Sequence, residues 1–237
     1  MQATVVDYFL NGRVRFGALT YYVSHEHPAV GDPGEGSLSY SPNGGLRLTI
    51  NRGGRRAPVP GTLRSSLVGG VYALCTSVEP SPRLAQEFGD TAIGVRDPSE
   101  FVRRLDSALF AKGATGQDAI RHGLVSYEDD ASLEPYIAWA LPEKIGFHKR
   151  ATNYQWQREY RLAFGPPGAW DVEAVDLDLE LRPTLPDGRV KLERYTIRPV
   201  SSYSPATPSA GVEWPSPGSH AVVDLGDIRD ICSLHKP

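Results

Sequence analysis

The residues best suited to chemistry lie around Glu159. In the segment 154–164, aromatic and aliphatic side chains occupy every even position except Arg158, and the odd positions are mainly polar. Such alternation predicts a strand with one face in the core. Gln157 and Glu159 are two residues apart and would project together from its open face, where an amide and a carboxylate can hold a polar ligand. The same pattern is also typical of the solvated face of an antiparallel strand.

Two other predicted strands carry side chains that could complete such a site. Arg15 lies on an early strand, and its fork of donors suits a pyrophosphate. Thr76 and Ser77 end an apolar strand in the middle of the chain, where the Ser77 hydroxyl can orient a ligand or a carboxylate. Glu159 could then stabilise positive charge that develops on a ribose. In the alternative interpretation, Arg15 and Glu159 form only a surface salt bridge.

In order and spacing, these residues resemble the arginine–serine–glutamate class of ADP-ribosyltransferases. That class has an arginine on an early strand, a Ser-Thr-Ser-like motif on a middle strand and Gln/Glu-x-Glu on a late strand; here Cys75 replaces the first serine. The resemblance implies that NAD is the substrate, with Arg15 on its phosphate or ribose and Ser77 beside its nicotinamide. Glu159 would stabilise an oxocarbenium-like transition state. Gln157 would position a macromolecular acceptor, either a nucleic-acid base or a protein side chain other than arginine, as in toxins and in phage-defence or counter-defence enzymes.

A second resemblance covers more of the chain and concerns an acidic loop. The loop Asp32-x-x-Glu35-Gly36 and the later Glu159-Tyr160-Arg161 are similar to a group of uncharacterised bacterial and phage proteins. This similarity implies that Asp32 and Glu35 approach the same site and contact the substrate. Their alternative role is to cap the loop, because Asp and Gly are common turn residues.

Four further residues are candidate ligand contacts. Tyr21 and Tyr22 could stack on the nicotinamide or adenine ring, although a tyrosine buried in the core is the commoner case. Arg55 and Arg56 belong to a basic, Gly- and Pro-rich segment that could contact the phosphates of a nucleic-acid acceptor. The alternative for both arginines is a solvated loop.

The composition indicates one soluble domain. The 237 residues include 24 Gly, 20 Pro and 11 Tyr, which favours a β-rich chain with many turns. We therefore expect a single domain, 1–237, with a loop excursion at 201–219. Its fold should be α+β, with twisted, mostly antiparallel sheets forming a split sandwich and few short helices. The clearest predicted helix begins at Pro98, with Asp97 as its N-cap.

The charge and the cysteines exclude several classes. A net charge of −3 gives no general basic surface for nucleic acid. Two cysteines make no disulfide framework, and no spacing resembles a zinc site. Neither a signal peptide nor an apolar stretch long enough to span a membrane is evident, so we expect a cytoplasmic protein that does not bind membranes.

Two alternatives to the transferase stay open. The first is a metal-dependent nucleic-acid-processing enzyme with Asp32, Glu35 and Glu159 as ligands, since clusters of carboxylates favour Mg²⁺ or Mn²⁺. The second is a non-catalytic interaction protein that binds a partner through residues 201–219 or through an open sheet edge.

Overall fold

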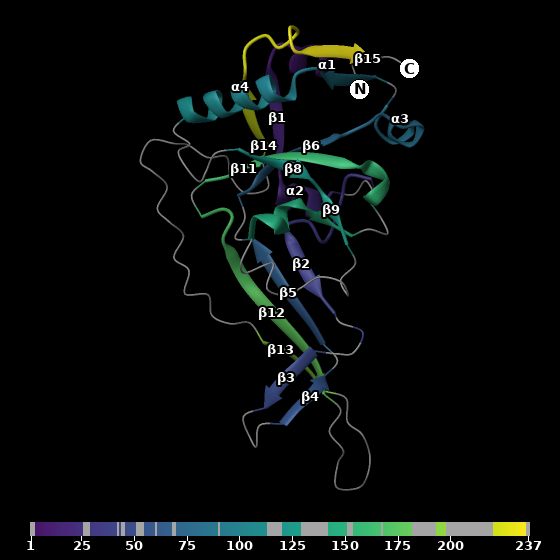
Figure 1. Ribbon diagram of the computed structural model, residues 1–237, viewed down its shortest axis with the longest axis vertical. Coiled ribbons are helices and arrows are strands. Elements are labelled where there is room, and N and C mark those ends of the chain that lie inside the picture. The colour runs from purple at the N-terminus through teal and green to yellow at the C-terminus, as the bar shows by residue number, and fades with distance from the viewer. Residues whose placement is uncertain are drawn as a thin grey trace.

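The computed structural model has an α+β fold, with few short helices and mostly antiparallel sheets, as predicted (Figure 1). It describes residues 3–25, 29–41, 43, 46–50, 55–59, 61–67, 70–89, 91–112, 120–128, 142–150, 154–166, 168–181, 193–197 and 220–235. The predicted excursion at 201–219 lies outside these residues.

The largest sheet is central to the candidate site. Its strands are β1 (Arg13–Ala18), β6 (Tyr72–Ser77), β8 (Arg121–Leu124), β11 (Glu159–Phe164) and β14 (His220–Asp224). They pair antiparallel in the order β14-β1-β6-β11-β8, so β6 is a central strand, as its apolar sequence predicts. The register places Glu159 opposite Ser77 and Arg161 opposite Cys75.

One face of this sheet packs against the helix α4 (Pro98–Ala111). The helix begins as predicted, because the Asp97 side chain accepts a hydrogen bond from the Glu100 backbone N–H at 3.0 Å. The apolar stripe of the helix is buried against the sheet through Phe101, Leu105 and Leu109. Figure 1 shows α4 lying across the upper part of the molecule.

A second antiparallel sheet meets the opposite face. Its strands are β2 (Ser37–Tyr40), β5 (Gly61–Leu67), β12 (Val172–Leu181) and β13 (Glu193–Ile197), in the order β13-β12-β5-β2. Leu38 and Leu67 from this sheet pack with Ala73 and Ala163 from the central sheet. Figure 1 shows the rest of the second sheet extending away from the central one.

The remaining elements are short. The helices are α1 (Ala3–Leu10), α2 (Leu19–Val23), α3 (Pro82–Phe88) and the 3₁₀ turns η2 (Pro142–Phe147) and η3 (Gln155–Gln157). The strand pairs are β3 (Leu46–Ile50) with β4 (Arg55–Val59), β7 (Ala92–Val95) with β15 (Cys232–His235), and the parallel pair β9 (Ser126–Tyr127) with β10 (His148–Lys149). β2 pairs with β5 and β3 with β4, so β2 and β3 do not form a hairpin with each other.

The segment 154–164 is a strand only in its second half. Residues Gln155–Gln157 form η3, and Arg158 takes a left-handed conformation at φ 44° and ψ 53°. The strand β11 begins after this reversal, at Glu159. The prediction of one continuous strand with Gln157 and Glu159 side by side is therefore wrong, because a non-glycine residue makes a turn that alternation does not signal.

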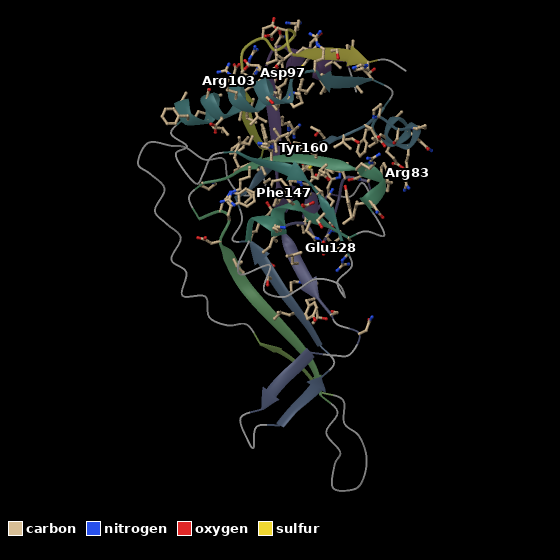
Figure 2. The ribbon with its side chains drawn as sticks, viewed as in Figure 1. Arg83, Asp97, Arg103, Glu128, Phe147 and Tyr160 are labelled. Atoms are coloured by element: carbon tan, nitrogen blue, oxygen red, sulfur yellow. The ribbon has the colours of Figure 1, made fainter. Side chains whose placement is uncertain are left out.

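Loss of the Asp97 cap of α4 should lower the free energy of unfolding. Asp97→Ala leaves a backbone N–H of the first turn without its partner, and we expect the free energy of unfolding to fall by about 1 kcal/mol in urea denaturation. The matched control is Asp106→Ala on an exposed position of the same helix, which should change it by less than about 0.5 kcal/mol. Equal effects of the two variants would contradict the capping role; Figure 2 labels Asp97 at the start of the helix.

Candidate functional site

Four charged side chains form a buried ion network between the central sheet and the segments that cover it. Arg161 is completely buried, and it donates from Nε to Glu159 at 2.8 Å and from both terminal nitrogens to Glu35, at 2.6 and 3.2 Å. It also donates to the carbonyl oxygen of Gly146. The Lys149 ammonium lies 2.8 Å from Oε2 of Glu159, as an ion pair, and 3.9 Å from Glu35. Two cations thus balance two carboxylates, as buried charges require.

Three separate parts of the chain supply this network. Glu159 and Arg161 are two apart on β11, so they project from the same face. Glu35 comes from the loop 29–36, where Asp32 accepts a hydrogen bond from the Gly34 backbone N–H at 2.8 Å and so shapes the turn. Lys149 comes from β10. The network therefore holds the loop and β10 onto β11.

Side chains at the turn η3 also hydrogen-bond to the loop 29–36. The Gln157 amide is buried, donates to the carbonyl oxygen of Ala29 at 2.7 Å and accepts from Lys149 at 3.2 Å. The Tyr154 hydroxyl donates to the carbonyl oxygen of Gly31 at 2.7 Å. Gln157 thus reaches Glu159 through Lys149, and not as its neighbour on a strand.

The network sets the charge of its members. Burial alone would raise the pKa of Glu159, but Arg161 and Lys149 outweigh it and hold that pKa at about 2. For Glu35 the burial is the larger effect, and its pKa is raised despite the same two cations. Burial, together with the nearby Glu159 charge, raises the pKa of Cys75 to about 12, so this cysteine is a neutral thiol at physiological pH.

Arg15 does not join the network. Its side chain is exposed and donates to Nε2 of His220 at 2.6 Å. The centre of the Tyr21 ring lies 4.5 Å from that of the His220 ring, and the half-buried Tyr22 packs over Gly17, where a Cβ would meet its hydroxyl at 2.7 Å. Burial also raises the pKa of Tyr22. The two tyrosines thus pack beside β1. The ion pairs of Glu159 are with Lys149 and Arg161, so the alternative interpretation of a surface salt bridge between Arg15 and Glu159 is wrong.

Of the other predicted contacts, Ser77 and Thr76 donate hydrogen bonds to backbone carbonyl groups. The Ser77 hydroxyl lies 2.8 Å from the carbonyl oxygens of both Gln157 and Glu79, and either can accept its hydrogen. Thr76 donates to the carbonyl oxygen of Tyr160 at 2.7 Å. These bonds tie β6 to β11. Arg55 and Arg56 are on β4, and their side chains lie outside the described residues.

Sequence reasoning missed two members of the network. Arg161 could have been found, because it follows Glu159 at the spacing that puts both on one face of the predicted strand. Lys149 gives no such signal, because its contact with Glu159 depends on the path of β10 over the sheet. Without these cations, the charge of Glu159 is not predictable.

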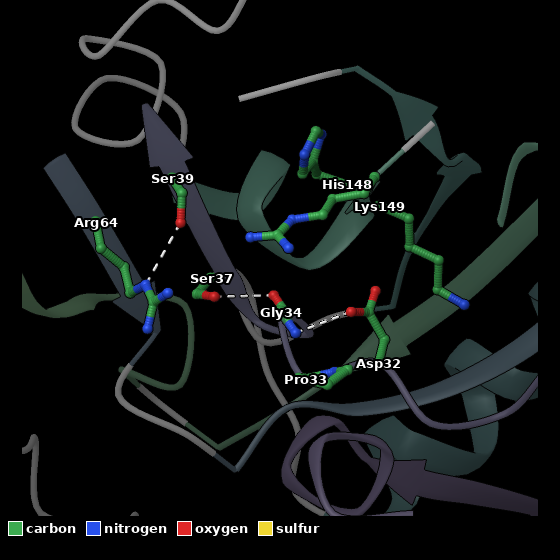
Figure 3. Close-up of a pocket in the computed structure, with 9 residues that line it drawn as sticks. Asp32, Pro33, Gly34, Ser37, Ser39, Arg64, His148 and Lys149 are labelled. Carbon is green, nitrogen blue, oxygen red and sulfur yellow. Dashed lines mark hydrogen bonds between the residues drawn. The ribbon is translucent and has the colours of Figure 1, made fainter. Parts of the chain in front are cut away.

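Two pockets lie beside β10, and Lys149 of the network lines the smaller one. The smaller has a volume of about 130 Å³ and is lined by Asp32, Pro33, Gly34, Ser37, Ser39, Arg64, His148, Lys149 and Arg150 (Figure 3). The larger has a volume of about 560 Å³ and is lined by Leu38, Ile120, Arg121, His122, Leu124, Ser126, Glu128, Lys144, Phe147 and His148. His148 lines both pockets. Successive residues of β2 face different pockets, Ser37 and Ser39 one and Leu38 the other.

Protein cations already pair with Glu35 and Glu159. In the part of the chain that the structure describes, no group of three or more His, Cys, Asp or Glu side chains is placed to hold a metal ion. Arg161 contacts both Glu35 and Glu159, and Asp32 accepts from a backbone N–H. The geometry gives the metal-dependent alternative no support.

The chain matches no protein-family model, and no curated protein and no solved structure is significantly similar to it. Within the described ranges, no helix is long and apolar enough to cross a membrane.

Removal of the central cation Arg161 should lower the free energy of unfolding far more than removal of a surface cation. Arg161→Met leaves two buried carboxylates facing Lys149 alone, so we expect a loss of about 3–5 kcal/mol in the free energy of unfolding, measured by urea denaturation. Arg103→Met is the control, because Arg103 pairs with Glu100 on the exposed side of α4, where solvent screens the pair, so the free energy of unfolding should change far less (Figure 2). Similar losses in both variants would show that the network does not hold the fold.

Proposed function

We propose that this protein is an ADP-ribosyltransferase that binds NAD along β10, in the two pockets that meet at His148, and uses Glu159 as its catalytic carboxylate. The observation that carries the proposal is the place and charge of Glu159. Its pKa of about 2 keeps it ionised at neutral pH, and it is separated from the smaller pocket by the side chain of Lys149, which lines that pocket.

The two pockets suit the two kinds of group in a dinucleotide. The volume of the larger one, about 560 Å³, is in the usual range for small-molecule sites. Leu38 and Phe147 offer it apolar surface, while His122 and Glu128 offer polar contacts for a base and a ribose. The smaller pocket is polar and suits phosphates. The proposal therefore moves the phosphate-binding role from Arg15 to β10.

In the proposed reaction, the bond between nicotinamide and C1 of the ribose breaks, and its electron pair leaves with nicotinamide. The ribose becomes oxocarbenium-like, and an ionised carboxylate nearby stabilises that charge. Glu159 can do so when Lys149 turns from it towards the phosphates of the ligand, since one anion then replaces another as the partner of the ammonium. A nucleophile of the macromolecular acceptor adds to C1 and loses its proton.

One observation favours a second candidate, a binding protein without catalysis. Glu159 is only 3% exposed, and Arg161 and Lys149 occupy both of its oxygens. If Lys149 does not move, the network is only a structural support for the pockets beside it. The two candidates agree on where the ligand binds and differ on whether it is cleaved.

Titration with NAD, followed by an assay of nicotinamide release, tests the proposal. We expect the wild-type protein to bind NAD and to release nicotinamide. Glu159→Gln should keep NAD binding, which also shows that it is folded, but lose about 100-fold or more in release, because the charge that stabilises the transition state is gone. The control Glu79→Gln changes an exposed carboxylate, 53% accessible, and should leave release unchanged.

The other outcomes separate the candidates. If NAD does not bind to the wild-type protein, the proposal is wrong. If NAD binds but is not cleaved, the protein belongs to the binding class, and Glu159→Gln should then lower only its stability.

A further inference from the structure

The smaller pocket combines cations with one carboxylate. Arg64 on β5 donates from Nε to the Ser39 hydroxyl at 3.4 Å, which directs its guanidinium along one wall (Figure 3). Arg150 lines the same pocket directly after β10. Guanidinium groups bind phosphate through planar, bidentate hydrogen bonds, so this pair is suited to a phosphoryl group.

Asp32 makes the pocket more selective than a simple anion site. It is only 4% exposed, and its Oδ1 is held by the Gly34 backbone N–H at 2.8 Å. Figure 3 shows its carboxylate among the side chains that line the pocket. A buried carboxylate repels a phosphate, but it accepts hydrogen bonds well from hydroxyl groups. The chemistry therefore favours a ligand that carries a hydroxyl close to its phosphate.

The Lys149 ammonium points into the buried network and, in this arrangement, is not available to bind a phosphoryl group in the pocket. It contacts Glu159 and Gln157 in the buried network, so its stem forms the pocket wall. The Ser37 hydroxyl is also engaged, since it donates to the carbonyl oxygen of Gly34 at 2.9 Å. The charged side chains of Arg64, Arg150 and Asp32 also line the pocket, and these charges define the ligand chemistry that we consider.

We infer that the smaller pocket is a sugar-phosphate subsite, in which Arg64 and Arg150 bind the phosphoryl group and Asp32 accepts a hydrogen bond from a sugar hydroxyl. The volume of about 130 Å³ limits the buried part of the ligand to a phosphoryl group and part of a pentose. This inference deepens the proposed function, because NAD contains such groups, but it does not depend on cleavage of NAD.

Calorimetric titration with ribose 5-phosphate and with inorganic phosphate tests the subsite. We expect ribose 5-phosphate to bind more tightly than phosphate. Arg64→Ala and Arg150→Ala should each weaken both ligands by about 10-fold, the usual effect of losing one charged hydrogen-bond donor. Arg83→Ala is the control: it removes an exposed arginine that stacks on Trp156, and it should change neither affinity.

The conservative variant Asp32→Asn tests the carboxylate. It retains an oxygen for the Gly34 N–H and removes the charge that repels phosphate. The affinity for phosphate should therefore rise, while the affinity for ribose 5-phosphate should fall or stay constant. The ratio of the two affinities should then be smaller than in the wild-type protein. Circular dichroism checks that each variant is folded.

Any one of three results would overturn the inference. The first is that neither ligand binds the wild-type protein, and the second is that Arg64→Ala and Arg150→Ala both bind the ligands with wild-type affinity. The third is that the wild-type protein binds the two ligands with equal affinity and Asp32→Asn changes neither affinity. The same experiments distinguish the subsite from the proposed function. Binding of ribose 5-phosphate without release of nicotinamide would support the subsite and contradict the transferase activity. Release of nicotinamide at the wild-type rate in Arg64→Ala and Arg150→Ala, with no binding of ribose 5-phosphate, would support the transferase activity and contradict the subsite.

Discussion

The fully buried guanidinium of Arg161 is the constraint on which the site depends. A charge without access to water is tolerated only when its donors are occupied, and here the partners come from three places: Glu159 on the same strand, Glu35 from the loop 29–36 and the carbonyl oxygen of Gly146 in η2. These segments must close over β11 together, because an incomplete set would leave buried charge unpaired. The network thus specifies the position of the loop and of η2 more than it adds to stability, since desolvation offsets much of the attraction.

The pockets follow from the same arrangement. Lys149 completes the neutral network, and as part of β10 it fixes where its neighbours His148 and Arg150 lie. His148 then lines both pockets, with β2 between them. The proposed site for phosphate and nucleoside groups therefore adjoins a network of paired charges, and the same network contains the ionised Glu159 on which the proposed transfer depends.

The sequence predicts the local features well. The α4 helix and its Asp97 cap were predictable, because the cap, the proline after it and the apolar stripe are all close in sequence. The strand containing Glu159 was predictable only from its own alternation, and the left-handed turn at Arg158 shortened it. Only the resemblance in the acidic loop pointed to Glu35, and its pairing with Arg161 could not be derived from the residues themselves, because the two are 126 positions apart and the fold brings them together. The partner of Arg15 was also not predictable, because His220 is 205 residues away in the sequence.

The state of Glu159 is the most direct test of this account, and NMR detection of its side-chain carboxyl carbon during a pH titration measures it. The pairing with Arg161 and Lys149 predicts that the carboxyl stays ionised well below the ordinary glutamate value of 4.5 and takes up a proton only near pH 2. Because the pKa is lowered on folding, the stability that this group adds should be complete above about pH 4.5 and lost as the pH falls towards 2. A carboxyl that titrates at 4.5 or above would show that the cations do not hold it, and both the network and the proposed catalytic role would be wrong.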